Sequence, residues 1–372
     1  MRWDEDLFVE VSDVEVILPP ESGVPAALSA YQREGRLEQP VKRRKDYLTD
    51  TWCHINIARA ERPWTVPSLH FEAGKTCFFC PGFEDHTPRA VSTGGDRLRM
   101  GEGSWHTRVF PNLYPWLMEH SNIVETPEHK TSLADIDATE EANALTAAAS
   151  FCREMEAEGR VPVLFRNHGW GASLSHFHWQ VGALPRIPSH IREELDGCSQ
   201  FSQKWQANVF DAIIESERAR GERWIAEDEF SAVIAPFAPR TNYEVWIIAK
   251  EPVSSLAACS GDQIRSLART LTRTLKVLYK VTQIDCLTVV CHQVPEAWNA
   301  SARHVLSSSA ELVLSKVEGL STGASAKLST GYRLHFEICP FKHWAGAERG
   351  LGEFAIEVIP EKTALELSTQ MR

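Results

Sequence analysis

Two series of hydrophobic and polar positions follow each other along this chain in a similar order. In the first, the segment 136–160 has the composition of a helix that stops at Gly159, and the apolar run VPVLFRN (161–167) follows as a buried strand. A glycine-containing turn then leads into SHFHWQVGALP (175–185). In this run polar residues occupy every second position, which predicts a strand.

The second series begins with a mostly helical segment, 187–221, and continues with strands within FSAVIAPFAPRTNYEVWIIAK (230–250). An amphipathic helix over 260–283 precedes two strands, CLTVVCHQVP and GYRLHFEICP, and the Ser-rich stretch 304–331 between them reads as a surface excursion. The similar order suggests a diverged internal duplication. We therefore predict an α+β fold of two tandem halves, each a mostly antiparallel sheet with packed helices.

Length and composition are consistent with this duplication. A chain of 372 residues exceeds what one core normally absorbs, and 43% hydrophobic with 24% charged residues is ordinary for a soluble globular protein. The net charge of −11 argues against a nucleic-acid partner. An acidic N-terminus, no uncharged apolar stretch of membrane-spanning length and nine scattered cysteines predict a cytoplasmic protein without a membrane partner.

Candidate chemistry gathers on the strand 175–185. Side chains at i, i+2 and i+4 of a strand share one face, so His176, His178 and Gln180 can form one site. A neutral imidazole can bind metal or attack phosphorus, and an amide can donate to a phosphoryl oxygen. The simpler alternative is an exposed polar strand face. The preceding turn offers Asn167 and Ser173, whose surroundings could hold an anion.

A second signal is the pair Cys77 and Cys80. Two thiolates at this CxxC spacing can reach the same zinc ion, but an isolated CxxC can equally be redox-active or inert. A tetrahedral zinc site needs two more ligands, and a downstream histidine pair is their usual source.

Taken together, ten blocks in a fixed order, the first beginning at residue 43 and the last ending at residue 354, resemble the galactose-1-phosphate uridylyltransferase family, a branch of the histidine-triad superfamily. The resemblance covers roughly residues 42 to 366. The blocks are RRKDYLTDTW, ARAERPW, CFFCPGFEDHTP, RVFPNLYPW, TPEHKTSLADI, NHGWGASLSHFHWQ, APRTNYEVWIIAK, CHQVP, LHFEICP and AGAERGLGEF. As a group they are far more specific than any one motif.

The resemblance implies a histidine-triad-like fold and specific roles for matching positions. It divides the chain into an N-terminal extension (1–40), a catalytic half with a zinc site (41–190) and a C-terminal half (191–372). The implied catalytic residues are His178 as nucleophile, with Gln180 and Ser173. The implied zinc ligands are Cys77, Cys80, His129 and His176. The implied nucleotide and phosphate contacts are Arg59, Arg62, Asn112, Asn167, Ser173 and Gln180, and the implied sugar contacts are Lys342 and Glu348.

A second metal, iron or zinc, is implied at His292, His335 and Glu337. Its fourth ligand would be Glu193 or Glu194, and the spacing does not choose between these two. The alternative is a hydrogen-bonded polar cluster without metal.

The activity implied is that of a nucleotidyltransferase that moves a nucleoside monophosphate between sugar 1-phosphates through a covalent nucleotidyl-histidine, with ping-pong kinetics. A nucleotide sugar and a sugar 1-phosphate would be its substrates, and the resemblance also suggests a homodimer. Three alternatives stay open: a phosphorylase of nucleotide sugars or dinucleotides that uses phosphate as acceptor, a histidine-triad hydrolase, and a zinc protein without turnover. Gln180 disfavours the hydrolase, because those enzymes favour a third histidine there.

The chain also departs from the family pattern. Phe177 and Trp179 stand where proline and glycine are usual, and Ala347 stands where the galactose enzymes tend to have an aromatic residue. We expect the side chains of Phe177 and Trp179 to lie on the strand face opposite His178, so that packing changes while the catalytic face is kept.

Overall fold

The computed structural model describes residues 1–18, 24, 26–61, 77–88, 90, 105–169, 172–297, 299, 331–340 and 351–371. Its centre is an antiparallel nine-stranded sheet of order β5-β6-β8-β7-β12-β13-β11-β10-β9. In chain order these strands are β5 (Arg108–Pro111), β6 (Met118–Val124), β7 (Val161–His168), β8 (His178–Leu184), β9 (Trp224–Glu227), β10 (Ser231–Ile234), β11 (Val245–Ala249), β12 (Leu287–His292) and β13 (His335–Pro340). Helices packed on an antiparallel sheet confirm the α+β class.

The strands of the two predicted halves join in this one sheet. β7 of the first half pairs with β12 of the second, with Arg166 opposite Val289. Outward from this junction the order β7-β8-β6 on one side matches β12-β13-β11 on the other, as expected for a duplicated unit. The predicted division between residues 190 and 191 falls in the first turn of the helix α3 (Ser189–Trp205), between the two sets of strands.

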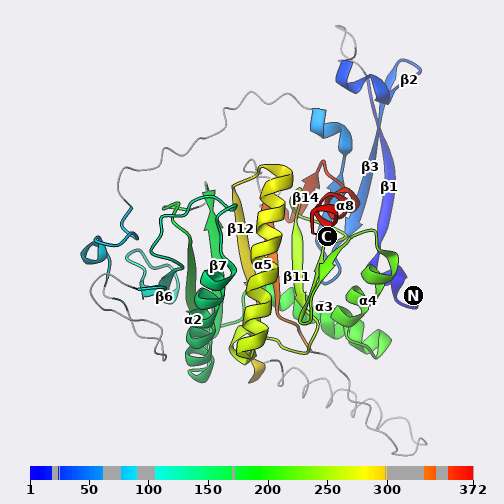
Figure 1. Ribbon diagram of the computed structural model, residues 1–372. Coiled ribbons are helices and arrows are strands. Elements are labelled where there is room, and N and C mark those ends of the chain that lie inside the picture. The colour runs from blue at the N-terminus through cyan, green and yellow to red at the C-terminus, as the bar shows by residue number, and fades with distance from the viewer. Residues whose placement is uncertain are drawn as a thin grey trace, which may run out of the picture.

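One face of the sheet is covered by the long helices α2 (Ala138–Ala157) and α5 (Gly261–Thr282), which lie side by side (Figure 1). The Asp137 carboxylate caps α2 by accepting the N–H groups of Thr139 and Glu140, and Ser260 with Gln263 forms a capping box on α5. Alternate strand residues, among them Trp179 and Phe336, are buried beneath these helices in the largest hydrophobic core.

The opposite face is covered in the second half by α3 and α4 (Val209–Arg220), which bury a second core against β10 and β11. The predicted helical segment 187–221 is therefore two helices. Gln206, with a φ of 51°, ends α3 in the left-handed conformation, and the Asn208 side chain accepts N–H groups at the start of α4. Among the described residues, no helix is both long enough and apolar enough to span a bilayer.

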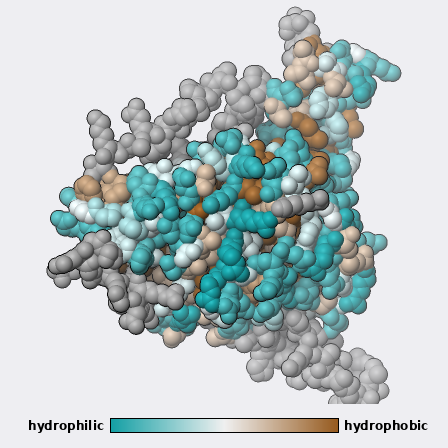
Figure 2. Space-filling view, viewed as in Figure 1, coloured by the Kyte–Doolittle hydropathy of each residue, from teal (hydrophilic) through white to brown (hydrophobic). Residues whose placement is uncertain are grey.

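The predicted N-terminal extension contributes to a smaller, five-stranded sheet. Its members are β1 (Glu10–Ile17), β2 (Gln32–Arg33), β3 (Arg36–Lys45), β4 (Trp52–Ile55) and β14 (Glu353–Ile356), with β14 parallel to β4. β3 runs across the predicted boundary at residue 40. The antiparallel pair of β1 and β3 projects from the molecule (Figure 1), and Figure 2 shows hydrophobic colour along it. Val14, Val16 and Leu18 are exposed in this part of the chain.

The remaining described elements are short or peripheral. They are α1 (Asp4–Leu7), η1 (Ala26–Tyr31), η2 (Ile57–Glu61), η3 (Glu84–His86), η5 (Leu256–Ala258) and α8 (Pro360–Gln370).

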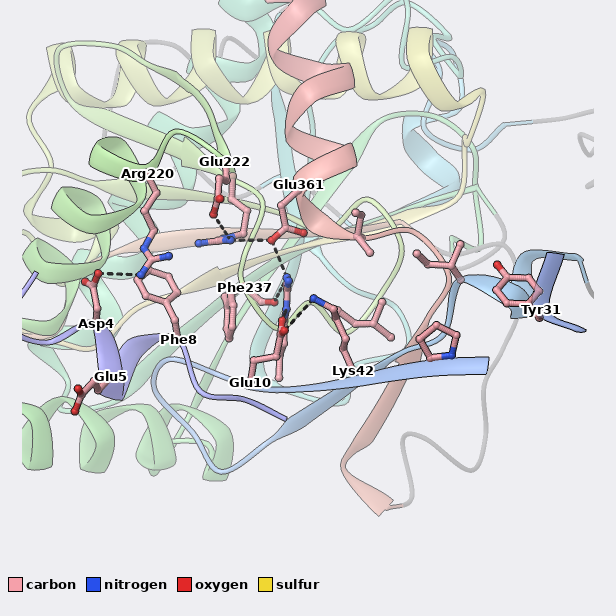
Figure 3. A pocket seen from close by; sticks show the side chains of 16 residues that line it. Asp4, Glu5, Phe8, Glu10, Tyr31, Lys42, Arg220, Glu222, Phe237 and Glu361 are labelled. Carbon is pink, nitrogen blue, oxygen red and sulfur yellow. Dashed lines mark hydrogen bonds and ion pairs between the residues drawn. The ribbon is translucent and has the colours of Figure 1, made fainter. Parts of the chain in front are cut away.

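A cavity of about 750 Å³ lies where α1, β1 and β3 meet α4 and α8 (Figure 3). Most of its charged side chains form ion pairs with other residues that line it. Arg44 bonds Glu10 at 2.7 Å and Glu361 at 2.9 Å, and Arg220 bonds Asp4 at 2.9 Å. No residue of the predicted site lines this cavity. These ion pairs attach the N-terminal segment to the body of the fold.

Candidate functional site

The predicted division of the His178 strand into two faces is confirmed. Phe177 and Trp179 are 2% and 0% exposed and belong to the core beneath α2 and α5. Because side chains alternate along a strand, His178 and Gln180 lie on the other face. The bulky residues at 177 and 179 therefore change the packing behind the strand and leave the His178 face intact.

Among the described residues, the hydrogen bond of the His178 ring engages Nδ1. Its Nδ1 lies 2.8 Å from the backbone carbonyl of His176. A carbonyl only accepts, so Nδ1 carries the proton and the lone pair resides on Nε2. The Phe79 ring packs edge-on against the imidazole at 5.1 Å between centroids. Burial lowers the pKa of His178 to about 4, so the imidazole is neutral, and hence nucleophilic, near pH 7.

Three predicted phosphate-contacting residues come together near His178. Phe165 of β7 pairs with Gln180, so Asn167, two residues further along β7, lies on the same face beside His178. The Thr288 hydroxyl donates to Asn167 Oδ1 at 3.0 Å. The Asn112 amide donates to Asn122 Oδ1 at 3.4 Å, and Asn122 of β6 lies opposite Gln180 of β8. Asn112 is thus linked to the site through Asn122.

His120 is a member of this group that the sequence reading missed. Its Nε2 lies 3.1 Å from Gln180 Oε1, and the side chain is buried. The available signal was the alternation of His120 and Asn122 in MEHSNIV, which places both on one strand face.

Other predicted contacts lie elsewhere or outside the described residues. Ser173 is exposed in the turn before β8. Arg59 lies in η2, where its guanidinium is 3.9 Å from the Glu357 carboxylate. Arg62, Lys342 and Glu348, together with Ala347 and residues 304–330 of the Ser-rich stretch, lie outside the described residues.

The four predicted zinc ligands converge. The ligand atoms of Cys77, Cys80, His129 and His176 all lie within 4.8 Å of one another. Cys80 Sγ is 3.2 Å from His129 Nδ1 and 3.7 Å from His176 Nδ1, and Cys77 Sγ is 3.6 Å from His176 Nδ1. With Zn–S of about 2.3 Å and Zn–N of about 2.0–2.1 Å, a tetrahedral site separates sulfur and nitrogen ligands by about 3.6 Å.

The bond that orients His176 also fits a metal site. His176 Nε2 lies 2.8 Å from the carbonyl of Thr126, so Nε2 donates the proton and the Nδ1 lone pair faces the two sulfurs. Two thiolates and two imidazoles satisfy four-coordinate zinc, and this donor set leaves no coordination position for substrate.

The second predicted cluster is completed by Glu194, which corrects the assignment of Glu193. Glu194, His292, His335 and Glu337 place ligand atoms within 4.8 Å of one another, and all four are buried. Glu194 lies on the inward face of α3, whereas the Glu193 side chain is 61% exposed and lies beside His190. Neighbouring residues of a helix point about 100° apart, so only one of the two carboxylates can reach the core.

Within this cluster some atoms are paired and others are not. His292 bridges the two carboxylates, with Nδ1 2.9 Å from Glu194 and Nε2 2.9 Å from Glu337. Although burial lowers the pKa of His292, both carboxylates raise it, to about 10 overall. His335 Nε2 and Glu337 Oε1 are buried without a hydrogen-bond partner and lie 4.0 Å apart. A nitrogen and a carboxylate oxygen that both lack a hydrogen-bond donor and lie this close together are suitable ligands for a cation between them.

His335 also repeats the local arrangement of His178. Its Nδ1 lies 2.9 Å from the carbonyl two residues earlier, that of Arg333, which leaves its lone pair on Nε2. The two halves thus present a histidine in the same tautomer on β8 and on β13. Arg240 contacts Glu337 and bonds Glu244 at 2.9 Å beside this cluster.

No family model matches the chain. It is 27% identical over 239 residues to the ADP-glucose phosphorylase of Arabidopsis thaliana, an alignment that covers 56% of this chain and 65% of that protein, just under two thirds. It is also 27% identical over 249 residues to the galactose-1-phosphate uridylyltransferase of Thermotoga maritima, covering 60% of this chain and 71% of that protein. The crystal structure of the Arabidopsis ADP-glucose phosphorylase with bound ADP-glucose shares the fold, with a TM-score of 0.68 at 24% identity over 88% of this chain and 98% of that one.

The structural similarity covers 88% of this chain and so both halves of the fold. Several relatives bear the name of the family that the ten sequence blocks predicted, and one is named for the phosphorylase activity kept as an alternative. The fold is therefore the histidine-triad-like fold expected from the sequence. The chain is therefore similar in sequence to the galactose-1-phosphate uridylyltransferase family of the histidine-triad superfamily and shares its fold.

Proposed function

We propose that this protein is a nucleotidyltransferase that moves a nucleoside monophosphate between sugar 1-phosphates through His178. The observation that carries the proposal is the state of this side chain: a buried, neutral imidazole whose Nδ1–H is bonded to a carbonyl, so that Nε2 holds the lone pair. Beside it lie the amides of Gln180 and Asn167, which are suitable donors for phosphoryl oxygens.

In the first step, Nε2 of His178 attacks the α-phosphorus of a nucleoside diphosphate sugar. The bond from phosphorus to the bridging oxygen breaks, sugar 1-phosphate leaves with the electron pair, and a nucleotidyl-histidine forms. In the second step, a phosphate oxygen of another sugar 1-phosphate attacks the same phosphorus and releases His178. Leaving group and acceptor are both phosphate oxygens of low pKa, so positioning and charge stabilisation can supply most of the rate.

Gln180 and Asn167 would donate to the non-bridging oxygens of the transferred phosphoryl group. Ser173 and Asn112 complete the proposed contacts from the turn before β8 and from the loop after β5. The exposed aromatic side chains Tyr114 and Trp116 on that loop offer stacking surfaces for a nucleobase. Arg59, whose Nε is buried without a hydrogen-bond partner among the described residues, is kept in the proposal as a contact to the nucleotide phosphates.

Zinc at Cys77, Cys80, His129 and His176 is part of the proposal. A closed four-ligand ion supplies a structural cross-link between segments distant in sequence. It would hold His176 in place, so the strand would present His178 in a constant position. The two neighbouring histidines then have separate tasks, one as ligand and one as nucleophile.

We further propose a second metal, iron or zinc, at Glu194, His292, His335 and Glu337. Its support is the pair of orphaned atoms on His335 and Glu337. Such an ion would stabilise the second half and takes no part in the steps above. A homodimer and a cytoplasmic location complete the proposal, and light scattering during size-exclusion chromatography would test the dimer.

A phosphorylase is the second candidate, favoured by the similarity to the Arabidopsis ADP-glucose phosphorylase. It would share the first step and differ only in the acceptor, which would be inorganic phosphate. A hydrolase is disfavoured because Gln180 stands where the histidine-triad hydrolases favour a third histidine.

The test is intact-mass analysis after mixing the purified protein separately with UDP-glucose, ADP-glucose and GDP sugars. We expect a covalent gain of one nucleoside monophosphate that is absent in H178A and present in H54A, a control that removes an exposed histidine. Labelled protein is then mixed with a sugar 1-phosphate or with phosphate, and the acceptor that removes the label separates transferase from phosphorylase. If folded, zinc-loaded wild-type protein gains no mass with any donor, nucleotidyl transfer through His178 is wrong.

A further inference from the structure

His120 has a defined protonation pattern that bears on Gln180. The backbone N–H of Trp116 donates to His120 Nδ1 at 3.4 Å, which requires a lone pair on Nδ1. A neutral imidazole then carries its proton on Nε2, 3.1 Å from Gln180 Oε1. Burial lowers the pKa of His120, which keeps the ring neutral.

The opposite tautomer satisfies fewer groups. With the proton on Nδ1, the Trp116 N–H would face another N–H, and Gln180 Oε1 would face a lone pair. Of the described residues, the Asn112 amide, 3.5 Å from Nε2, could then donate to the ring. In the first tautomer this amide instead donates to Asn122 Oδ1 at 3.4 Å. Since buried polar groups are normally paired, the Nε2–H form is favoured.

The backbone around His120 is built for this contact. β6 and β8 shift register between Met118 and Ser121, and Glu119 has a φ of 50°. This bulge lies beside Gly182 of β8, where an added Cβ would be 2.6 Å from the Leu117 side chain. The absence of a side chain at Gly182 lets the 112–118 loop approach β8, and this loop carries the Trp116 N–H that orients His120.

We propose that His120 is a positioning residue for phosphoryl transfer, because its Nε2–H binds the amide oxygen of Gln180 and thereby directs the amide N–H groups of Gln180 to the phosphoryl oxygens. A primary amide presents either its oxygen or its nitrogen after a rotation of half a turn, and the oxygen would repel a phosphoryl oxygen. Fixing the amide oxygen on His120 removes the unproductive orientation. This inference rests on the proposed function and adds a residue that does not touch the substrate.

The test is the rate at which His178 becomes nucleotidylated, followed by rapid quench and intact mass with the donor that labels the wild type. The matched variants are H120L, which keeps volume and removes the donor, and H120Q, whose amide can donate from nearly the same place. Loss of a neutral hydrogen bond corresponds to a change of about tenfold. We expect H120L to slow labelling by about tenfold with little change in donor affinity, and H120Q to recover most of the loss.

The decisive comparison repeats H120L in a Q180A background. If His120 acts through Gln180, H120L causes no further slowing there, whereas independent effects would multiply. Equal slowing in both backgrounds would overturn the inference, as would an unchanged rate in H120L or a rate in H120Q as low as in H120L. Unfolding midpoints identify variants slowed by partial unfolding. If the wild type and H120L are nucleotidylated at the same rate, only the role of His120 is refuted. If the wild type is not nucleotidylated at all, the proposed function itself is refuted.

Discussion

The indole N–H of Trp179 donates to the carboxylate of Glu141 at 2.8 Å, across the contact between β8 and α2. Glu141 also accepts from Arg166 at 2.7 Å, and the guanidinium lies over the Trp179 ring at 4.5 Å. Arg166 contacts a second buried carboxylate, that of Glu125. Trp179 therefore does more than fill the space behind His178, because it satisfies part of a buried ionic group.

Replacing Trp179 tests this packing. W179G removes a fully buried indole and should lower the free energy of unfolding by about 3–5 kcal/mol, because truncation of a buried aromatic side chain leaves a cavity. W179F keeps most of the volume and loses the bond to Glu141, so a smaller loss of about 1–3 kcal/mol is expected. Urea unfolding measures both. If both variants are as stable as the wild type, neither the volume of the indole nor its bond to Glu141 contributes to stability.

The pH dependence of labelling follows from the burial of His178. Its pKa is lowered to about 4, so the nucleophilic, neutral form persists well below the ordinary histidine value of about 6.5. The labelling rate should be constant from pH 8 to about 5 and fall by half near pH 4. In the unfolded chain the same residue takes up a proton already near pH 6.5, so stability should also decrease as the pH falls from there.

Rapid-quench labelling across this range, with the folded fraction followed in parallel by circular dichroism, separates protonation from unfolding. A rate that halves near pH 6.5 while the protein stays folded would contradict a buried, neutral His178.

Removing a zinc ligand should separate the tasks of the two neighbouring histidines. C77S should lose zinc, measured by mass spectrometry of the metal, and should unfold at lower urea, because metal binding is coupled to folding. H178A, altered one pleat further along the strand, should keep its zinc and lose labelling. Unchanged metal content in C77S would refute the proposed ligand set.

The second cluster offers a matched pair of adjacent carboxylates. E194Q removes a buried charge that His292 and Tyr332 contact, so we expect loss of the second metal and a lower unfolding midpoint. E193Q alters an exposed side chain and should change neither quantity. Metal analysis distinguishes zinc from iron in the same samples. If wild type and E194Q carry the same metal content, with only the four-ligand zinc present, the cluster is a hydrogen-bonded group without a second ion.

Much of the local structure is predictable from the chain. Periodicity predicts the helix 136–160 and the strand 161–167, and these are α2 and β7 within a few residues. The alternation around His178 correctly separates Phe177 and Trp179 from the strand face that carries His178. The break between α3 and α4 was not predicted, because α3 ends at Gln206 in the left-handed conformation. Glycine is the usual residue in that conformation, and the sequence has no glycine at this position.

The sequence by itself determined the spacing of polar residues along each strand and the motifs that indicate the family, because both depend on residues close together in the chain. Only the tertiary structure decided which distant segments meet. It paired β7 with β12, brought Glu194 rather than Glu193 to His292, and set His120 against Gln180. These contacts depend on helix rotation, strand register and a β-bulge, and a shift of one residue in any of them changes which side chain faces the site.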